Sequence, residues 1–262
     1  TGNTLQIGAS SDFNYGTGDF TVELFANKFA DNNDASLYSF HTGNPTIEIR
    51  IDENDKPMLE CQSVEGDDYQ ISSSDGDVQL KNWYHLAGVK SGSNLTLYRD
   101  GVAIATRSDL SGNFGNSTAT TYIGGRSGTK AYGGYIEAVR VSNSARYTEN
   151  FTPPTASFTN DSNTKLLIQN GTDGSQTFTD GSSSSHTITV NGDVRWFAPK
   201  VGAGAWFCKS STDSCYEVAD STDFDIGTGD FTLEGYVKFR ELDEGNSTQK
   251  IISKFSETGN KR

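Results

Sequence analysis

The chain has 262 residues, and its 34 aspartates and glutamates outnumber its 21 lysines and arginines, which gives a formal net charge of -13. Such a charge repels phosphate backbones and anionic lipid headgroups, so we expect neither nucleic acids nor membranes as partners. Hydrophobic residues make up only 33% of a chain that holds 28 glycines, a composition that favours many short strands joined by turns.

Alternating apolar residues predict these strands in chain order. They lie at 20–26, 46–51 and 95–99, and the last is followed by Asp100-Gly101, a pair suited to the positive φ angles of a tight hairpin before 102–105. Further strands are expected at 121–123, 135–141, 165–168 and 187–190. No stretch keeps a helical period of apolar residues for three turns, so the sequence predicts an all-β, two-sheet antiparallel sandwich.

Residues from about Thr4 to Ser157 are predicted to form most of this sandwich. The residues expected to be mostly buried are Phe20, Val22, Leu24, Trp83, His85, Leu97, Ile123, Ile136 and Val139. His85 follows Trp83 by two and shares its face of the strand, so a structural role is favoured over a catalytic one.

The chain also contains a long internal repeat. Residues 10–23 read SSDFNYGTGDFTVE and residues 221–234 read STDFDIGTGDFTLE, so ten of fourteen positions are identical at an offset of 211. An offset of this length describes whole domains in tandem. Residues 151–163, with adjacent prolines at 153 and 154, are expected to connect the two copies.

Five segments have the pattern of one known family. They read DFNYGTGDFTVE at 12–23, WYHLAGV at 83–89, LYRDG at 97–101, IGG at 123–125 and GYIEAVRVS at 134–142. Together they resemble the LamG-like jelly-roll domains of the concanavalin A-like lectin and glucanase superfamily. The segment from Ala145 to Gly171 is similar to the junction between tandem copies in bacteriophage tail-fibre and other phage structural proteins.

The resemblance implies a particular domain organisation. Residues 1–158 form a LamG-like jelly roll whose opening strand is missing or supplied by 165–170, residues 159–164 form a linker, and residues 165–262 begin a second, truncated jelly roll. Strands whose apolar face is not covered by other strands are only marginally stable in water. We therefore expect the chain to be a fragment of a longer polypeptide or to be completed by another subunit of a homo-oligomer.

The sequence predicts no enzyme. Hydrolases of this superfamily carry an E-x-D-x-x-E strand that places acid and nucleophile on one face. The segment 241–244 has no acid at Asn246, and Glu48-Ile49-Arg50 has a base where the motif needs a carboxylate.

Calcium is the one cofactor that remains open, because lectin-like sandwiches often hold it in rim loops. Asp67 and Asp68 precede the predicted strand at 69–71, and Asp75 and Asp77 follow it. These four are candidate ligands, although surface acids in so acidic a protein usually only solvate it.

Sugar binding requires an exposed aromatic face beside hydrogen-bonding side chains. The candidates are Tyr69, Tyr132, Tyr135 and Tyr147, which lie in or beside loops rich in Asn, Asp and Gly. For each of them, packing in the core or at an edge is the alternative.

Two of the three cysteines form a candidate disulfide. Cys208 and Cys215 flank a polar segment as cross-strand partners at a hairpin would, and two reduced thiols are the alternative. Cys61 is expected to be a buried strand thiol.

Two functions follow from these observations. In the first, the chain is a non-catalytic carbohydrate-binding or adhesion module of a phage fibre or extracellular surface protein, and it recognises host-surface glycans. In the second, it is a structural spacer or decoration protein of a virion or surface filament and contacts only other subunits. Both place it on a virion or extracellular surface.

Overall fold

The computed structural model describes residues 3–29, 34–41, 45–74, 78–115, 118–126, 129–196 and 232. The chain divides into two compact units, residues 1–198 and 199–262, and all the strands described belong to the first. Cys208 and Cys215 lie outside the described residues.

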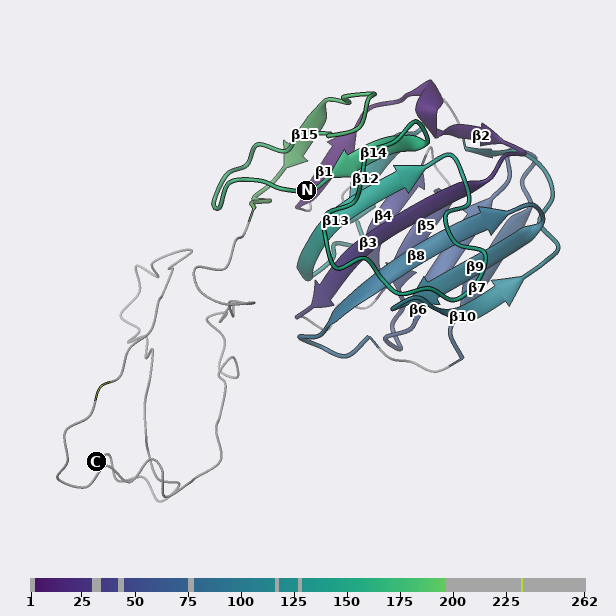
Figure 1. The fold of residues 1–262 in the computed structure, drawn as a ribbon, viewed down its shortest axis with the longest axis horizontal. Helices are drawn as coiled ribbons and strands as arrows, with labels where there is room; N and C mark the ends of the chain where they lie inside the picture. Colours follow the sequence, from purple (N-terminus) through teal and green to yellow (C-terminus); the bar gives the residue numbers. More distant parts are fainter. Residues whose placement is uncertain are drawn as a thin grey trace, which may run out of the picture. The chain divides into compact units, whose positions relative to one another are not determined.

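The first unit is a sandwich of two antiparallel sheets (Figure 1). The seven-stranded sheet contains, in spatial order, β15 (Ile188–Asn191), β1 (Thr4–Ile7), β12 (Thr120–Ile123), β4 (Ala35–His41), β5 (Pro45–Ile51), β6 (Pro57–Gln62) and β7 (Asp68–Ser72). The six-stranded sheet contains β10 (Val102–Arg107), β9 (Asn94–Arg99), β8 (Trp83–Ser91), β3 (Phe20–Lys28), β13 (Gly134–Ser142) and β14 (Thr164–Ile168).

The remaining elements are small. A two-stranded pair joins β2 (Asn14–Gly16) to β11 (Phe114–Gly115), and one 3-10 turn spans Ser11–Phe13. No α-helix occurs in the described part of the chain. This confirms the predicted all-β jelly roll.

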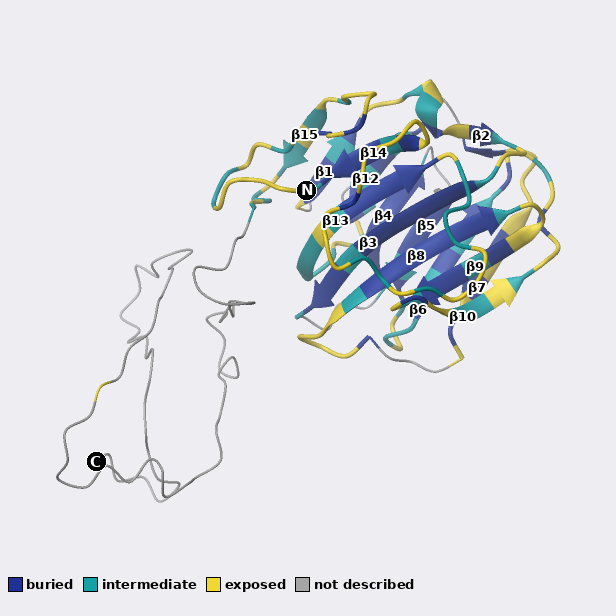
Figure 2. Cartoon of the chain, in the orientation of Figure 1, coloured by how far each residue is buried: buried dark blue, intermediate teal, exposed yellow. Residues whose placement is uncertain are grey.

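Apolar residues at every second position of the central strands form the core. Phe20, Val22 and Leu24 of β3 are fully buried between the sheets, and the blue strands of Figure 2 show that both sheets are buried along most of their length. Gly88 of β8 allows the sheets to approach, because a Cβ there would lie 2.9 Å from Leu59 Cδ1 of the opposite sheet. The free thiol of Cys61 is buried as expected.

The hairpin between β9 and β10 has the predicted turn. Asp100 and Gly101 take φ angles of 50° and 77°, and Val102 pairs with Arg99. This pair of positive angles matches the right-handed twist of the two strands.

Two strands that follow the prolines pair with the sandwich. β14 pairs with β13, placing Ile168 opposite Val139, and β15 pairs with β1, placing Val190 opposite Leu5. Leu166 of β14 is fully buried in the core. This pairing favours the alternative in which residues 165–170 supply a strand to the first jelly roll, and the compact unit runs past the boundary expected at 158.

A long segment packs on the outer face of the six-stranded sheet. We call residues 143–163 the covering segment; its path across β8 and β9 can be followed in Figure 1. Tyr147 and Phe151 pack against Ala87, Val89 and Tyr98 of that face. This face of the sheet is therefore largely closed to solvent.

One residue predicted in the core is not there. Trp83 is 45% exposed, because it is the first residue of β8 and lies on the outer face of the sheet at the strand end. His85 on the same face is only 1% exposed, since the rings of Phe151 and Phe158 lie against it. Ile136 is half-buried, and the other residues predicted in the core are buried.

Among the described residues, no helix has the length and apolar character needed to cross a membrane.

Candidate functional site

A buried ionic network lies beneath the covering segment. Glu23 of β3 is fully buried, and its Oε1 accepts hydrogen bonds from Arg140 Nη2 at 2.7 Å and Nε at 2.8 Å. Its Oε2 accepts one from the Tyr147 hydroxyl at 2.8 Å and lies 3.2 Å from His85 Nε2. Burial acts to raise the pKa of Glu23, but the hydrogen bond with His85 and the charge of Arg140 outweigh it, so this pKa is lowered.

This network is closed rather than open to a ligand. The guanidinium of Arg140 lies 4.3 Å from the centre of the Phe158 ring, and the ring of Tyr147 stacks on Phe151 with centroids 3.5 Å apart. Tyr147, predicted as a sugar-binding residue, thus uses its hydroxyl and its ring to hold the covering segment on the sheet.

Tyr69 is buried in the core, and Tyr132 is half-buried against it. Tyr69 is 6% exposed, its hydroxyl lies 3.0 Å from Ser111 Oγ, and its ring packs against Phe114. Tyr132 packs against the core, and burial raises the pKa of its hydroxyl. The ring of Tyr69 is therefore closed to a sugar, and that of Tyr132 is only partly exposed.

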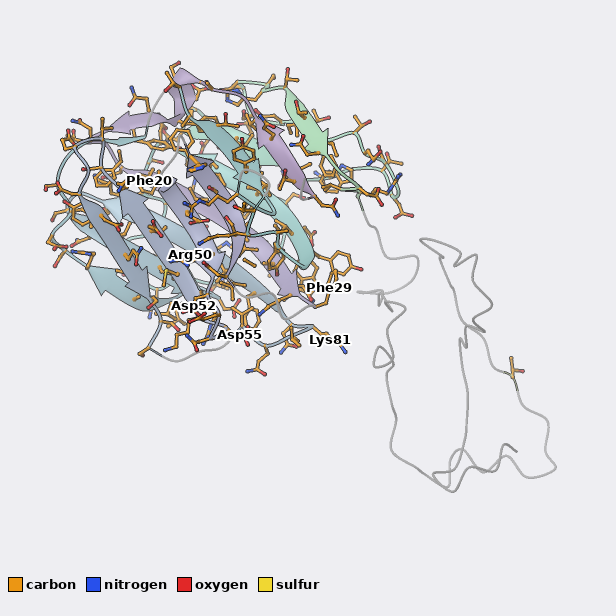
Figure 3. The ribbon with its side chains drawn as sticks, turned by 180° about the vertical axis from the view of Figure 1, so that it is seen from behind. Phe20, Phe29, Arg50, Asp52, Asp55 and Lys81 are labelled. Carbon is orange, nitrogen blue, oxygen red and sulfur yellow. The ribbon has the colours of Figure 1, made fainter. Side chains whose placement is uncertain are left out.

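Tyr135 belongs to an aromatic group at the surface. Its ring stacks with Trp83 at a centroid distance of 6.3 Å and contacts Phe29 at 5.2 Å. Trp83 and Tyr135 both pair with Asn27, so their rings flank that residue on the outer face of the six-stranded sheet. We call Phe29, Trp83 and Tyr135 the aromatic patch; Figure 3 shows Phe29 at the end of the sheet, close to Lys81.

Of the four candidate calcium ligands, only Asp67 and Asp68 lie in the described part of the chain. Asp67 and Asp68 are exposed, and Asp67 N donates a hydrogen bond to Ser63 Oγ at 3.0 Å. Asp75 and Asp77 lie outside the described residues. Within the described ranges, no three His, Cys, Asp or Glu side chains are grouped closely enough to hold a metal ion.

The outer face of the seven-stranded sheet is polar and charged. Figure 3 looks onto this face, with Arg50 among its strands. Glu48 and Arg50 of β5 lie beside Glu60 of β6, and Arg50 is paired with Asp34. Burial and the charge of Glu48 raise the pKa of Glu60.

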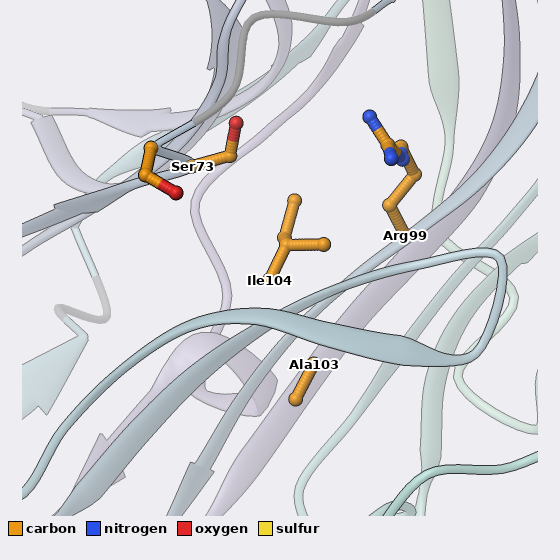
Figure 4. A pocket seen from close by; sticks show the side chains of 5 residues that line it. Ser73, Arg99, Ala103 and Ile104 are labelled. Carbon is orange, nitrogen blue, oxygen red and sulfur yellow. The ribbon is translucent and has the colours of Figure 1, made fainter.

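A small pocket lies where β10 meets the end of β7. It has a volume of about 240 Å³ and is lined by Ser73, Ser74, Arg99, Ala103 and Ile104. Figure 4 shows Ile104 between Arg99 and Ser73. Its lining contains no aromatic ring on which a sugar could stack.

Comparison with known proteins defines the family. Residues 1–150 match the family model Laminin_G_3, described as the concanavalin A-like lectin/glucanases superfamily. The chain belongs to this family. No match is found among curated proteins.

Several solved structures are similar to this chain. A protein of Bacteroides ovatus ATCC 8483 to which carbohydrate binding is ascribed has a TM-score of 0.51 and 17% identity, over 72% of this chain and 58% of that one. The heptameric SAP-like pentraxin of Limulus polyphemus has a TM-score of 0.44 and 18% identity, over 56% and 72% of the two chains. The Ruminococcus gnavus IT-sialidase CBM40, bound to α2,3-sialyllactose, has a TM-score of 0.44 and 17% identity, over 50% and 78%.

These likenesses describe the fold alone. The chain spans 58% of the length of the Bacteroides ovatus protein.

Of the aromatic patch, the sequence predicts Tyr135 as a sugar-binding residue and expects Trp83 to be buried, and it makes no prediction for Phe29. Both of these other rings lie at strand ends: Trp83 begins β8, and Phe29 follows the end of β3.

Proposed function

We propose that this jelly roll is a carbohydrate-binding module with no catalytic activity of its own, and that a sugar ring stacks on the aromatic patch. The observation that carries the proposal is the ring of Trp83, which is 45% exposed yet held in place by its stack with Tyr135. An exposed ring of this kind offers a flat apolar surface to the C–H face of a pyranose.

The surroundings of the patch suit such a ligand. Trp83 and Tyr135 stand on β8 and β13, the two strands that flank β3 in one sheet, so little conformational entropy is lost when a ligand orders them. Asn82 and Glu137 are exposed beside these two residues and can form hydrogen bonds with hydroxyl groups. Support also comes from the family and from the carbohydrate binding ascribed to the Bacteroides ovatus protein of the same fold.

The biological setting is part of the proposal. The internal repeat and the junction-like segment 145–171 support a tandem array in a phage fibre or another extracellular surface protein, where homo-oligomeric copies would recognise host-surface glycans. Many copies on one fibre would convert weak single contacts into strong attachment.

The proposal is tested by screening the full chain on a glycan array and titrating the bound glycans by calorimetry. Trp83→Ala should weaken binding at least about tenfold, because it removes the exposed ring. Val102→Ala is the matched control, since Val102 is 52% exposed on β10 at the edge of the same sheet and should leave affinity unchanged.

Two outcomes would contradict the proposal. Absence of any bound glycan, both with added calcium and with a chelator, would favour the structural spacer. Equal affinity of Trp83→Ala and the parent chain would move the site elsewhere on the molecule.

A further inference from the structure

One side of the sandwich is closed by residues that follow the family-matched part of the chain. The family model covers residues 1–150, whereas β14 and β15 lie beyond it. β14 forms an edge of the six-stranded sheet, and β15 forms an edge of the seven-stranded sheet. The opposite edges, β10 and β7, contact each other, so β14 and β15 share the other side of the sandwich, drawn in green in Figure 1. We call residues 158–196 the edge module.

The edge module is held together by contacts of its own. The Gln169 side chain binds both backbone groups of Phe158, accepting a hydrogen bond from its N at 2.8 Å and donating one to its O at 2.8 Å. The carboxylate of Asp180 accepts hydrogen bonds from Leu167 N at 2.9 Å and from His186 N at 2.8 Å. These bonds join β14 to the segments before and after it, so the module can leave its place as one piece.

Non-covalent contacts attach the edge module to the rest of the sandwich. Leu166 of β14 pairs with Val141, and Val190 of β15 pairs with Leu5. Leu166 is fully buried in the core, so the attachment depends mainly on apolar burial and strand pairing. The sandwich therefore offers the same surface to an identical module from a second copy of the chain.

A short hinge precedes the edge module. Phe151 N donates a hydrogen bond to Gly101 O at 2.9 Å, and the next hydrogen-bonded residue along the chain is Phe158. Within the described part of the chain, residues 152–157 form no hydrogen bond, and they are exposed or half-buried. They include the adjacent prolines 153 and 154, which favour an extended chain. We call residues 152–157 the hinge, because they contribute little to holding the module on its own sandwich.

We infer that the edge module is exchanged between two copies of the chain, so that each module closes the sandwich of the other copy. The exchanged pair keeps the contacts of the single chain, so only the hinge and the protein concentration set the balance between the two forms. Six extended residues reach about 20 Å, which lets the module leave while Phe151 stays on its own sheet. This interaction goes beyond the proposed function, because it involves no residue of the aromatic patch.

The test uses two full-length variants, each with one new cysteine in a chain that carries Cys208→Ser and Cys215→Ser. Gln6 of β1 lies opposite Thr189 of β15, so one variant carries Gln6→Cys and the other carries Thr189→Cys. The two are mixed, held just below the melting temperature, cooled and treated with a short bis-maleimide. Cys61 is buried and does not react. A crosslink between two chains then reports the module of one chain seated on the sandwich of the other.

The in-register pair should give at least about tenfold more crosslinked dimer than a control pair of Thr189→Cys and Ser72→Cys, because a seated module holds its thiol at millimolar effective concentration. Ser72 is exposed on β7, at the opposite edge of the same sheet, so only collisions bring it to Thr189 of another chain. The double variant Gln6→Cys/Thr189→Cys should crosslink within one chain, which shows that the reagent spans the pair.

The length of the hinge gives a second readout. Deletion of residues 153–155 leaves three hinge residues with a reach of about 10 Å, which hinders the return of the module to its own sandwich. The deletion should raise the dimer-to-monomer ratio of the full chain at least about tenfold in sedimentation velocity. Insertion of three glycines after Ala156 is the matched control and should lower this ratio or leave it unchanged.

The inference is overturned if the in-register pair crosslinks no more between chains than the control pair. It is also overturned if the chain with the shortened hinge folds with the melting temperature and the dimer-to-monomer ratio of the parent. If that chain does not fold, the crosslinking yield alone decides.

Discussion

At the scale of single residues, Glu23 joins three side chains from different elements. This fully buried carboxylate binds Arg140 of β13, Tyr147 of the covering segment and His85 of β8. A buried charge is tolerated only when it is paired and hydrogen-bonded, and these three partners satisfy both of its oxygens. Glu23 therefore joins two strands and the segment that covers them.

Glu23→Gln should lower the free energy of unfolding by about 3 kcal/mol, because it leaves the Arg140 guanidinium buried without its counter-charge. Urea denaturation followed by circular dichroism measures this. Glu137→Gln, an exposed position on the same strand as Arg140, is the control and should cost less than about 0.5 kcal/mol. A cost equally small for Glu23→Gln would show that the network does not stabilise the fold.

The stability of the parent chain relative to Glu23→Gln should also depend on pH. Folding lowers the pKa of Glu23 below its ordinary 4.5, so the carboxylate contributes its full stabilisation above that pH. The contribution is lost as the pH falls from 4.5 through the lower pKa of the folded state. The stability difference between the parent chain and Glu23→Gln should therefore shrink on acidification in this range, as measured by urea midpoints at successive pH values.

At the scale of elements, the hairpin between β9 and β10 anchors the covering segment. Gly101 accepts a backbone hydrogen bond from Phe151 N at 2.9 Å, and a Cβ on Gly101 would lie 1.8 Å from Phe151 O. Gly92, in the turn between β8 and β9, also has a positive φ, but a Cβ there meets nothing within 4 Å. The two glycines therefore differ in packing rather than in backbone angle.

Gly101→Ala should lower the free energy of unfolding by about 3 kcal/mol or more. Gly92→Ala should lower it by only about 1–2 kcal/mol, the cost of an alanine in the left-handed region. Thermal unfolding compares the two variants. Trypsin should also cleave Gly101→Ala faster at Arg146, because the covering segment is displaced. If the two variants lost equal stability, the close contact between Gly101 and Phe151 would not contribute to the stability of the fold.

At the scale of the whole molecule, the sandwich is completed by a strand from beyond the prolines. β14 closes one edge of the six-stranded sheet and buries Leu166 among residues that precede position 150. The covering segment runs between β13 and β14 and makes this closure possible.

Leu166→Ala should lower the stability of the first jelly roll by about 2–5 kcal/mol, because it leaves a cavity in the core. Hydrogen exchange in the full chain should become faster for amides of β3 and β13. Lys165→Ala, at the half-buried neighbouring position, is the control and should leave these rates nearly unchanged. Unaltered exchange in Leu166→Ala would show that β14 is dispensable to this sandwich.

The sequence by itself determined the fold class, the strands and the β9–β10 turn. These features depend on local rules: alternation of apolar residues specifies a half-buried strand, and Asp100-Gly101 suits the turn whatever lies around it. The motifs from residue 12 to residue 142 were equally sufficient for the family, because most of them mark β3, β8, β9 and β13, the inner strands of the six-stranded sheet.

Only the tertiary structure decided which polar and aromatic side chains meet, and which remain exposed. Arg140 and Tyr147 lie 117 and 124 residues from Glu23 along the chain, and Ser39 meets Glu48 only through strand register. Trp83 and His85 stand on the same face of one strand, yet the covering segment buries only His85. Exposure on a sheet depends on what crosses it, and that is a long-range property which no local pattern encodes.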